Sequence, residues 1–135
     1  MMRAFVKNTP FGFAYAYRKS IEVAENREAA RVKVENSHAD ILLLGGKKDG
    51  WWDTHEACLR IMEELSKHQY PYHHDYIAYE GAGHACYAPF VLPAREFTAP
   101  LKMAPRLVFS EEVSWEAQAA ALEDAWQRTI EFFKR

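Results

Sequence analysis

Residues 41–54, with the sequence ILLLGGKKDGWWDT, set the class of fold that this chain can form. Four large aliphatic residues in succession run into two glycines, and one carboxylate, Asp49, then stands between two lysines and two tryptophans. A short uninterrupted aliphatic run is typical of a strand that is buried on both faces of a parallel sheet. We therefore predict a strand at residues 41–44, with Asp49 just beyond its carboxyl end.

A helix and a second strand are predicted to follow. Asp53 or Thr54 can cap the helix, because apolar residues then recur at helical spacing until about His68. Residues 75–79 combine aromatic and β-branched side chains ahead of a glycine-containing loop, which indicates a second strand. A strand–helix–strand unit of this kind is a right-handed crossover that places both strand ends at one edge of the sheet. Ligands of open α/β sheets bind outside that edge.

The whole chain, residues 1–135, is predicted to form a single α/β domain. Residues 1–31 are interpreted as an irregular arm, to about Tyr17, followed by a short surface helix, and residues 32–135 as the α/β region. Residues 88–110 hold four prolines and no steady period, which favours a long loop near the site.

A final helix is predicted to begin after Ser114, which can cap it. Apolar residues follow at three- and four-residue spacing, which is typical of a helix that turns one stripe to the core. The stripe comprises Trp115, Ala119, Leu122, Trp126, Ile130 and Phe133.

Composition excludes several classes of protein. The net charge of −2 gives no basic footprint for nucleic acid, and no apolar run is long enough to predict a membrane span. The two cysteines, Cys58 and Cys86, have no zinc or redox spacing. Reduced thiols of this kind favour a soluble, cytoplasmic protein.

Asp49 and His84 are the candidate catalytic residues, because each follows the end of one of the two predicted strands. A buried carboxylate that accepts the Nδ1 proton of an imidazole fixes its tautomer and stabilises the imidazolium, as in the base half of a nucleophilic triad. Gly81 and Gly83 let the backbone turn sharply before His84. A structural role for both residues stays open on these grounds alone.

Three blocks, ILLLGGKKDGWW, YEGAGHACYAP and EDAWQRTIEFF, resemble the C-terminal domain of the acyl-CoA thioesterase and bile-acid-CoA:amino acid N-acyltransferase family, which has the α/β-hydrolase fold. The resemblance covers roughly Val32 to the end of the chain and implies a mostly parallel sheet with Asp49 and His84 in the triad. The positions that match are Gly46, Asp49 and Trp52, then Tyr79, Gly81, Ala82, Gly83 and His84, then Asp124, Ala125, Trp126, Phe132 and Phe133. The family usually continues its Trp with Pro-Ser, where this chain has Asp53 and Thr54.

The nucleophile that the resemblance implies is missing. No Ser or Cys stands in a Gly-x-Ser-x-Gly or Gly-x-Cys-x-Gly elbow. The chain is therefore interpreted as the C-terminal part of a hydrolase of acyl thioesters without its nucleophilic half: a truncated product, one of two chains, or a reduced relative with a non-catalytic task. A carboxylesterase or dienelactone-type hydrolase is the alternative substrate class, and a non-catalytic self-associating domain the alternative outside enzymes. A half sheet has an unpaired edge, so we expect association with itself or with a chain that carries the N-terminal half.

The remaining residues of interest have two interpretations each. Trp51 and Trp52 could bind the acyl group of a substrate or only cover the strand end. The pair of lysines at 47 and 48 could attract a phosphate-bearing thioester or form a solvated turn. Cys86 could act as a replacement nucleophile, although a small packed thiol is favoured. The histidines at positions 55, 68, 73 and 74 lack the spacing of a metal site, so neither metal nor cofactor is expected.

Overall fold

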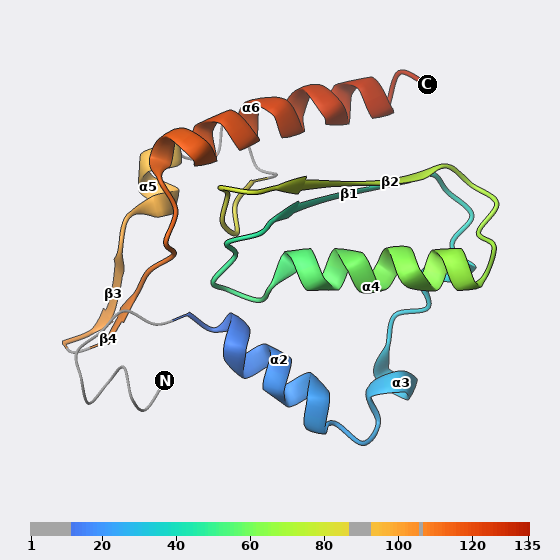
Figure 1. The fold of residues 1–135 in the computed structure, drawn as a ribbon, viewed down its shortest axis with the longest axis horizontal. Helices are drawn as coiled ribbons and strands as arrows, with labels where there is room; N and C mark the ends of the chain where they lie inside the picture. The colour runs from blue at the N-terminus through green and yellow to red at the C-terminus, as the bar shows by residue number, and fades with distance from the viewer. Residues whose placement is uncertain (1–11, 87–92, 106) are drawn as a thin grey trace.

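The computed structural model of the chain describes residues 12–86, 93–105 and 107–135. These residues form a mixed α/β domain in which α4 and α6 lie on opposite sides of a pair of strands (Figure 1). The elements are α2 (Ala14–Val23), α3 (Arg27–Ala30), a 3-10 turn η1 (Val34–Asn36), β1 (Ile41–Gly46), α4 (Thr54–Lys67), β2 (His74–Tyr79), α5 (Ala94–Thr98), β3 (Leu101–Ala104), β4 (Leu107–Phe109) and α6 (Trp115–Phe132).

The strand–helix–strand unit is the part of the prediction that the structure confirms most closely. β1 and β2 pair in parallel, in a register that runs from Ile41 opposite His74 to Gly46 opposite Tyr79. Among the described residues this sheet has two strands, and the other sheet, β3–β4, is antiparallel. The predicted mostly parallel sheet is therefore not confirmed, and the structure supports only a mixed domain with two small sheets.

The two long helices, α4 and α6, begin at the predicted N-cap residues. Asp53 adopts a left-handed backbone conformation, with φ of 55°, and its side chain accepts a hydrogen bond from the backbone N–H of Glu56. Ser114 accepts one from the N–H of Ala117 at 3.2 Å. Each bond satisfies a donor that the first turn of a helix cannot satisfy itself.

The predicted core stripe of α6 is correct only in part. Leu122 is buried and Ala119 and Ile130 are half-buried, but Trp115, Trp126 and Phe133 are exposed. The buried residues of the helix are Gln118, Ala121, Leu122 and Ala125. Small side chains let the helix approach the sheet closely, so the face with alanines is buried and the face with large aromatics is turned outward. The hydroxyl of Tyr79 donates to the carboxylate of Asp124 at 2.9 Å and ties the end of β2 to this helix.

The long loop predicted at residues 88–110 is also wrong for the residues described there. They form the short helix α5 and the β3–β4 hairpin, while residues 87–92 and 106 lie outside the described part. Three of the four prolines that suggested a loop stand beside these elements: Pro93 occupies the N-cap position of α5, Pro100 precedes β3, and Pro105 lies between the two strands. Proline is compatible with element ends, so its frequency did not mark an irregular segment here.

The N-terminal prediction needs a smaller correction. The irregular arm expected to reach Tyr17 gives way to α2 at Ala14, and the surface helix expected at residues 18–31 is divided between α2 and α3. The part of the arm at residues 1–11 lies outside the described residues. No residue of α2 is buried, so this helix adds little to the core.

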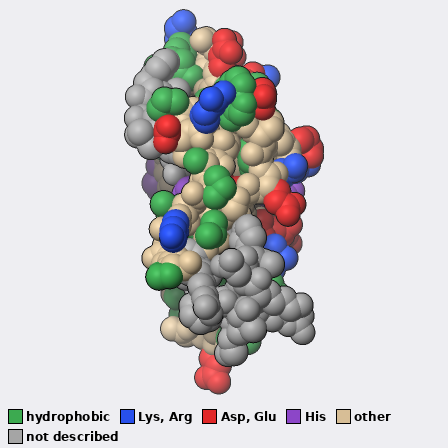
Figure 2. All heavy atoms as spheres, turned by 90° about the vertical axis from the view of Figure 1, so that its left-hand side faces the viewer, with side chains coloured by type: hydrophobic (Ala, Val, Ile, Leu, Met, Phe, Trp, Pro, Cys, Tyr) green, Lys and Arg blue, Asp and Glu red, His purple; other side chains and the backbone are tan. Residues whose placement is uncertain are grey.

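Large hydrophobic side chains are exposed at the end of the molecule that carries α5 and the hairpin. Leu101, Met103 and Trp115 each expose more than a third of their surface. Figure 2 views this end and shows hydrophobic side chains scattered among single charged ones. Within the described part of the chain, no helix has both the length and the apolar character needed to cross a membrane.

The loop after β2 packs directly on the end of β1. A Cβ atom added to Gly46 would lie 2.2 Å from the carbonyl oxygen of Gly83 and 2.4 Å from that of Ala82. Both atoms belong to the backbone, which cannot move aside as a flexible side chain can. Glycine at this position is therefore what allows the two strand-end loops to touch.

Replacement of Gly46 by alanine should lower the free energy of unfolding by about 1–3 kcal/mol, because the added methyl group overpacks a backbone contact. Gly45→Ala is the matched control, since its nearest neighbour is the hydroxyl at the end of the Tyr76 side chain, 3.3 Å away. Urea unfolding of both variants measures the difference. Equal losses of stability in the two variants would contradict the proposed contact.

Candidate active site

The structure brings Asp49 and His84 together at the carboxyl edge of the β1–β2 pair. The Oδ2 atom of Asp49 lies 3.0 Å from the Nδ1 atom of His84. The Asp49 side chain is fully buried, while the imidazole of His84 keeps 19% of its surface exposed. Parallel strands end at the same edge, so two residues that are distant in sequence become partners in one hydrogen bond.

The carboxylate of Asp49 is held in its ionised form. Its Oδ1 atom accepts hydrogen bonds from the backbone N–H groups of Trp51, at 2.8 Å, and Trp52, at 3.3 Å. Burial alone would raise the pKa of Asp49, but the hydrogen bonds from His84 and from the Trp51 amide prevail and lower it. An ionised carboxylate has no proton to give, so Nδ1 of His84 is the donor and the lone pair of the neutral imidazole is on Nε2.

Trp51 and Trp52, the predicted substrate-binding residues, have different surroundings. The ring of Trp51 packs against Phe109, with centroids 4.4 Å apart, and against Phe13 at 5.6 Å. Trp52 is 48% exposed and meets the imidazole of His84 edge-on at 4.8 Å. The first tryptophan therefore helps to cover the strand end, while the second forms an exposed rim beside the histidine.

Two polar side chains that no sequence motif singled out hold the histidine loop. Gln118 of α6 is 1% exposed, and its Oε1 atom accepts the N–H of Gly83 at 2.9 Å. Glu111, which follows β4, accepts the N–H of His84. The spacing of Gln118 with Ala121 and Ala125 is helical and could have indicated its buried position, whereas nothing local distinguishes Glu111 from the exposed Glu112 beside it.

Both cysteines are packed thiols. Cys58 and Cys86 are buried, and burial raises the pKa of each thiol to about 11. A thiol with such a pKa is scarcely ionised at neutral pH, and the thiolate is the nucleophilic form. Burial and the raised pKa therefore favour the structural interpretation of Cys86 over the replacement-nucleophile interpretation.

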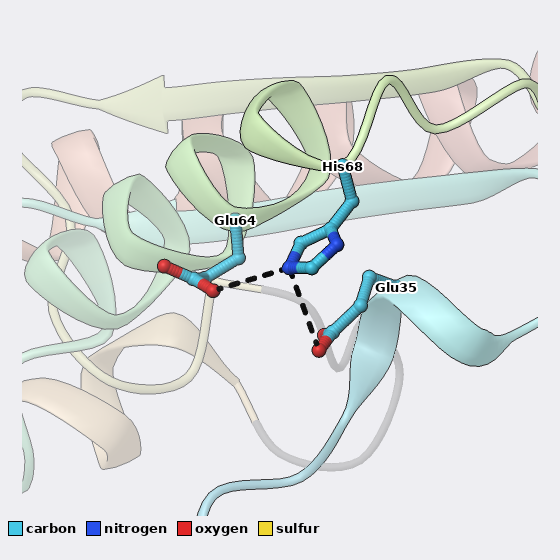
Figure 3. A group of neighbouring side chains, drawn as sticks. All are labelled: Glu35, Glu64 and His68. Carbon is cyan, nitrogen blue, oxygen red and sulfur yellow. Dashed lines mark ion pairs between the residues drawn. The ribbon is translucent and has the colours of Figure 1, made fainter. Parts of the chain in front are cut away.

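One group of side chains among the described residues has the composition of a metal site. Nε2 of His68 lies 3.9 Å from a carboxylate oxygen of Glu35 and 4.0 Å from one of Glu64 (Figure 3). Arg31 already bridges the two carboxylates, at 2.8 Å from Glu35 and 3.3 Å from Glu64. Hydrogen bonds from this guanidinium lower the pKa of Glu35 to about 2, so a metal ion would have to displace a strong partner.

The described residues thus define a small mixed α/β domain with an aspartate–histidine pair at the edge of two parallel strands. The sequence profile described as BAAT/acyl-CoA thioester hydrolase C terminal matches residues 4–135, and the chain belongs to this family. The match confirms the resemblance and extends it from about Val32 toward the N-terminus. No curated protein and no solved structure shows a significant match to the chain.

Replacement of Asp49 by asparagine should cost about 1.5–3 kcal/mol of stability at neutral pH, because buried charge-assisted hydrogen bonds are lost. The folded-state pKa of Asp49 lies below its ordinary value of 3.8, so its ionisation stabilises the fold above that pH. This stability is lost as the pH falls through the lowered pKa.

The difference in unfolding free energy between wild type and Asp49→Asn should therefore shrink below about pH 4. Urea unfolding at pH 7, 5, 4 and 3 measures it. Asp75→Asn, at an exposed position on β2, should show no comparable difference at any of these pH values. A difference that stays constant down to pH 3 would show that folding does not lower the pKa of Asp49, and a difference that grows as the pH falls would show that folding raises it.

Proposed function

We propose that this chain supplies the acid and the histidine of a nucleophile–histidine–aspartate triad that acts on acyl-CoA thioesters, by hydrolysis or by acyl transfer. The observation that carries the proposal is the hydrogen bond between the buried carboxylate of Asp49 and Nδ1 of His84. Membership of the acyl-CoA thioester hydrolase family supports the thioester as substrate.

Each residue has a defined task in this mechanism. Asp49 holds the imidazole with Nδ1 as donor and stabilises the positive charge that develops on it. Nε2 of His84 takes the proton of a Ser or Cys as that residue attacks the acyl carbonyl carbon. His84 then returns the proton to the sulfur of the departing thiol, and an acyl-enzyme remains. In the second half-reaction Nε2 takes a proton from water or an amine, which attacks the acyl-enzyme and releases the product.

The nucleophile has to come from outside these 135 residues. The sequence has no glycine-flanked elbow, and both thiols are buried, which raises the pKa of each and disfavours the nucleophilic thiolate. β1 and β2 pair only with each other among the described residues, so each strand has an outer edge that can accept a further strand. A segment or chain that carries an elbow and adds strands to this sheet would complete both the fold and the triad.

A non-catalytic, self-associating domain is the second candidate. The exposed aromatic side chains of Trp115 and Trp126 on α6, and of Phe133 at its C-cap, support it, because exposed aromatic side chains favour association with another surface. A carboxylester or dienelactone-type substrate is the alternative within the enzyme proposal, since the Asp49–His84 pair does not depend on the acyl leaving group.

The proposal is tested by joining this chain to the N-terminal half of an acyl-CoA thioesterase of the same family, ending before the acid strand. The fused protein should hydrolyse acyl-CoA. His84→Ala should lower kcat by roughly 10³-fold or more and Asp49→Asn by roughly 10⁴-fold, because the first removes the base and the second leaves it in the wrong tautomer. The unfused chain should show no hydrolysis that depends on His84.

Three results would contradict the proposal. Hydrolysis by the unfused chain that disappears in His84→Ala would mean that the chain carries its own nucleophile. Preference for p-nitrophenyl esters over acyl-CoA would favour the carboxylester alternative. An inactive fused protein that is folded, together with a defined oligomer of the unfused chain in sedimentation, would favour the non-catalytic domain. His68→Ala, on the exposed end of α4, is the control and should leave kcat unchanged.

A further inference from the structure

Glu111 joins the two loops that carry Asp49 and His84. Its Oε1 atom accepts the backbone N–H of Gly50 at 2.8 Å and that of His84 at 3.1 Å, and Oε2 lies 3.3 Å from the latter nitrogen. Gly50 is the residue directly after Asp49. One carboxylate therefore binds one amide from each side of the Asp49–His84 hydrogen bond.

The glycines around this carboxylate leave room for it. A Cβ atom added to Gly83 would lie 2.2 Å from Oε2 of Glu111, and one added to Gly50 would lie 3.2 Å from its Cγ. Glycine is therefore required at position 83, the second glycine of the Gly-Ala-Gly segment, because any larger residue would push Glu111 away from the His84 amide.

The hairpin brings Glu111 to this place. It lies two residues after Phe109, which is 4% exposed and packs on Trp51 of the acid loop. Packing of Phe109 against Trp51 places the end of β4 beside the acid loop, and Glu111 then reaches both amides. The carboxylate is at the junction of three segments that are far apart in sequence.

We propose that Glu111 is a positioning residue that sets the separation of Asp49 and His84 by holding the amides of Gly50 and His84 on one carboxylate. It acts on the reaction only through these two residues, so its catalytic meaning rests on the proposed function above. Burial raises the pKa of Glu111, and the negative charge of Asp49 raises it further. The hydrogen bonds from the amides of Gly50 and His84 and the charge of His84 act in the opposite direction, but the net effect is a raised pKa. Charge-assisted bonds to two amides are strongest when the carboxylate is ionised.

Nuclear magnetic resonance of the ¹⁵N-labelled 135-residue chain tests the arrangement without substrate. The amide protons of Gly50 and His84 should shift together with pH, at one midpoint above 4.5, because both are bonded to the same titrating carboxylate. Glu111→Gln keeps an acceptor oxygen but cannot titrate, so it should abolish the shared transition. The adjacent exposed Glu112→Gln is the matched control and should retain it.

Hydrogen exchange gives a second readout. In Glu111→Ala the amides of Gly50 and His84 should exchange at least about tenfold faster while those of α4 are unchanged, and Glu111→Gln should restore part of the protection. Should Glu111→Ala fail to fold, the comparison of Glu111→Gln with Glu112→Gln still tests whether Glu111 binds both amides. Separate midpoints for the two amides, or a transition shared by both amides that survives in Glu111→Gln, would overturn the proposal.

Kinetics of the fused protein separate this inference from the proposed function. Glu111→Gln should lower kcat roughly tenfold with KM unchanged, because the pair is loosened while substrate contacts remain. Unchanged kcat in an active fused protein would overturn the positioning role. An inactive wild-type fused protein would contradict the proposed function. The resonance measurements on the unfused chain would then still test whether Glu111 binds the amides of both loops.

Discussion

Contact between the loop after β2 and the end of β1 is the constraint on which the site depends. The parallel register sets Gly46 opposite Tyr79, and the carbonyls of Ala82 and Gly83 then pass so close to Gly46 that no side chain fits there. The loops continue from this contact to Asp49 and His84, whose side chains meet. A short parallel pair thus fixes the position of two side chains that no local segment could bring together.

The elements that could be predicted from the sequence are those with a strong local pattern. Residues close together in the sequence produce each of these patterns: the aliphatic run of β1, the cap at Asp53 and the periodicity of α4. The buried face of α6 could not be predicted in this way, because the large apolar residues suggested one face while close approach to the sheet required the alanines. Likewise, prolines at element ends hid the β3–β4 hairpin.

The residues of the candidate site also differ in whether local sequence patterns could predict them. Asp49 and His84 follow strands that were evident from the sequence, so their meeting could be anticipated from the rule that parallel strands end at one edge. Glu111 and Gln118 approach the histidine loop from the hairpin and from α6. Their roles arise from packing between distant segments, and a glutamate beside another glutamate gives no local sign of such a role.

The two tryptophans beside His84 have a practical consequence. The indole rings of Trp52 and Trp51 lie 4.8 and 5.9 Å from the imidazole, whereas the other two tryptophans of the chain stand on α6. Any movement of the histidine loop would therefore change the surroundings of two of the four indoles, so that tryptophan emission is an optical probe of this loop that needs no label.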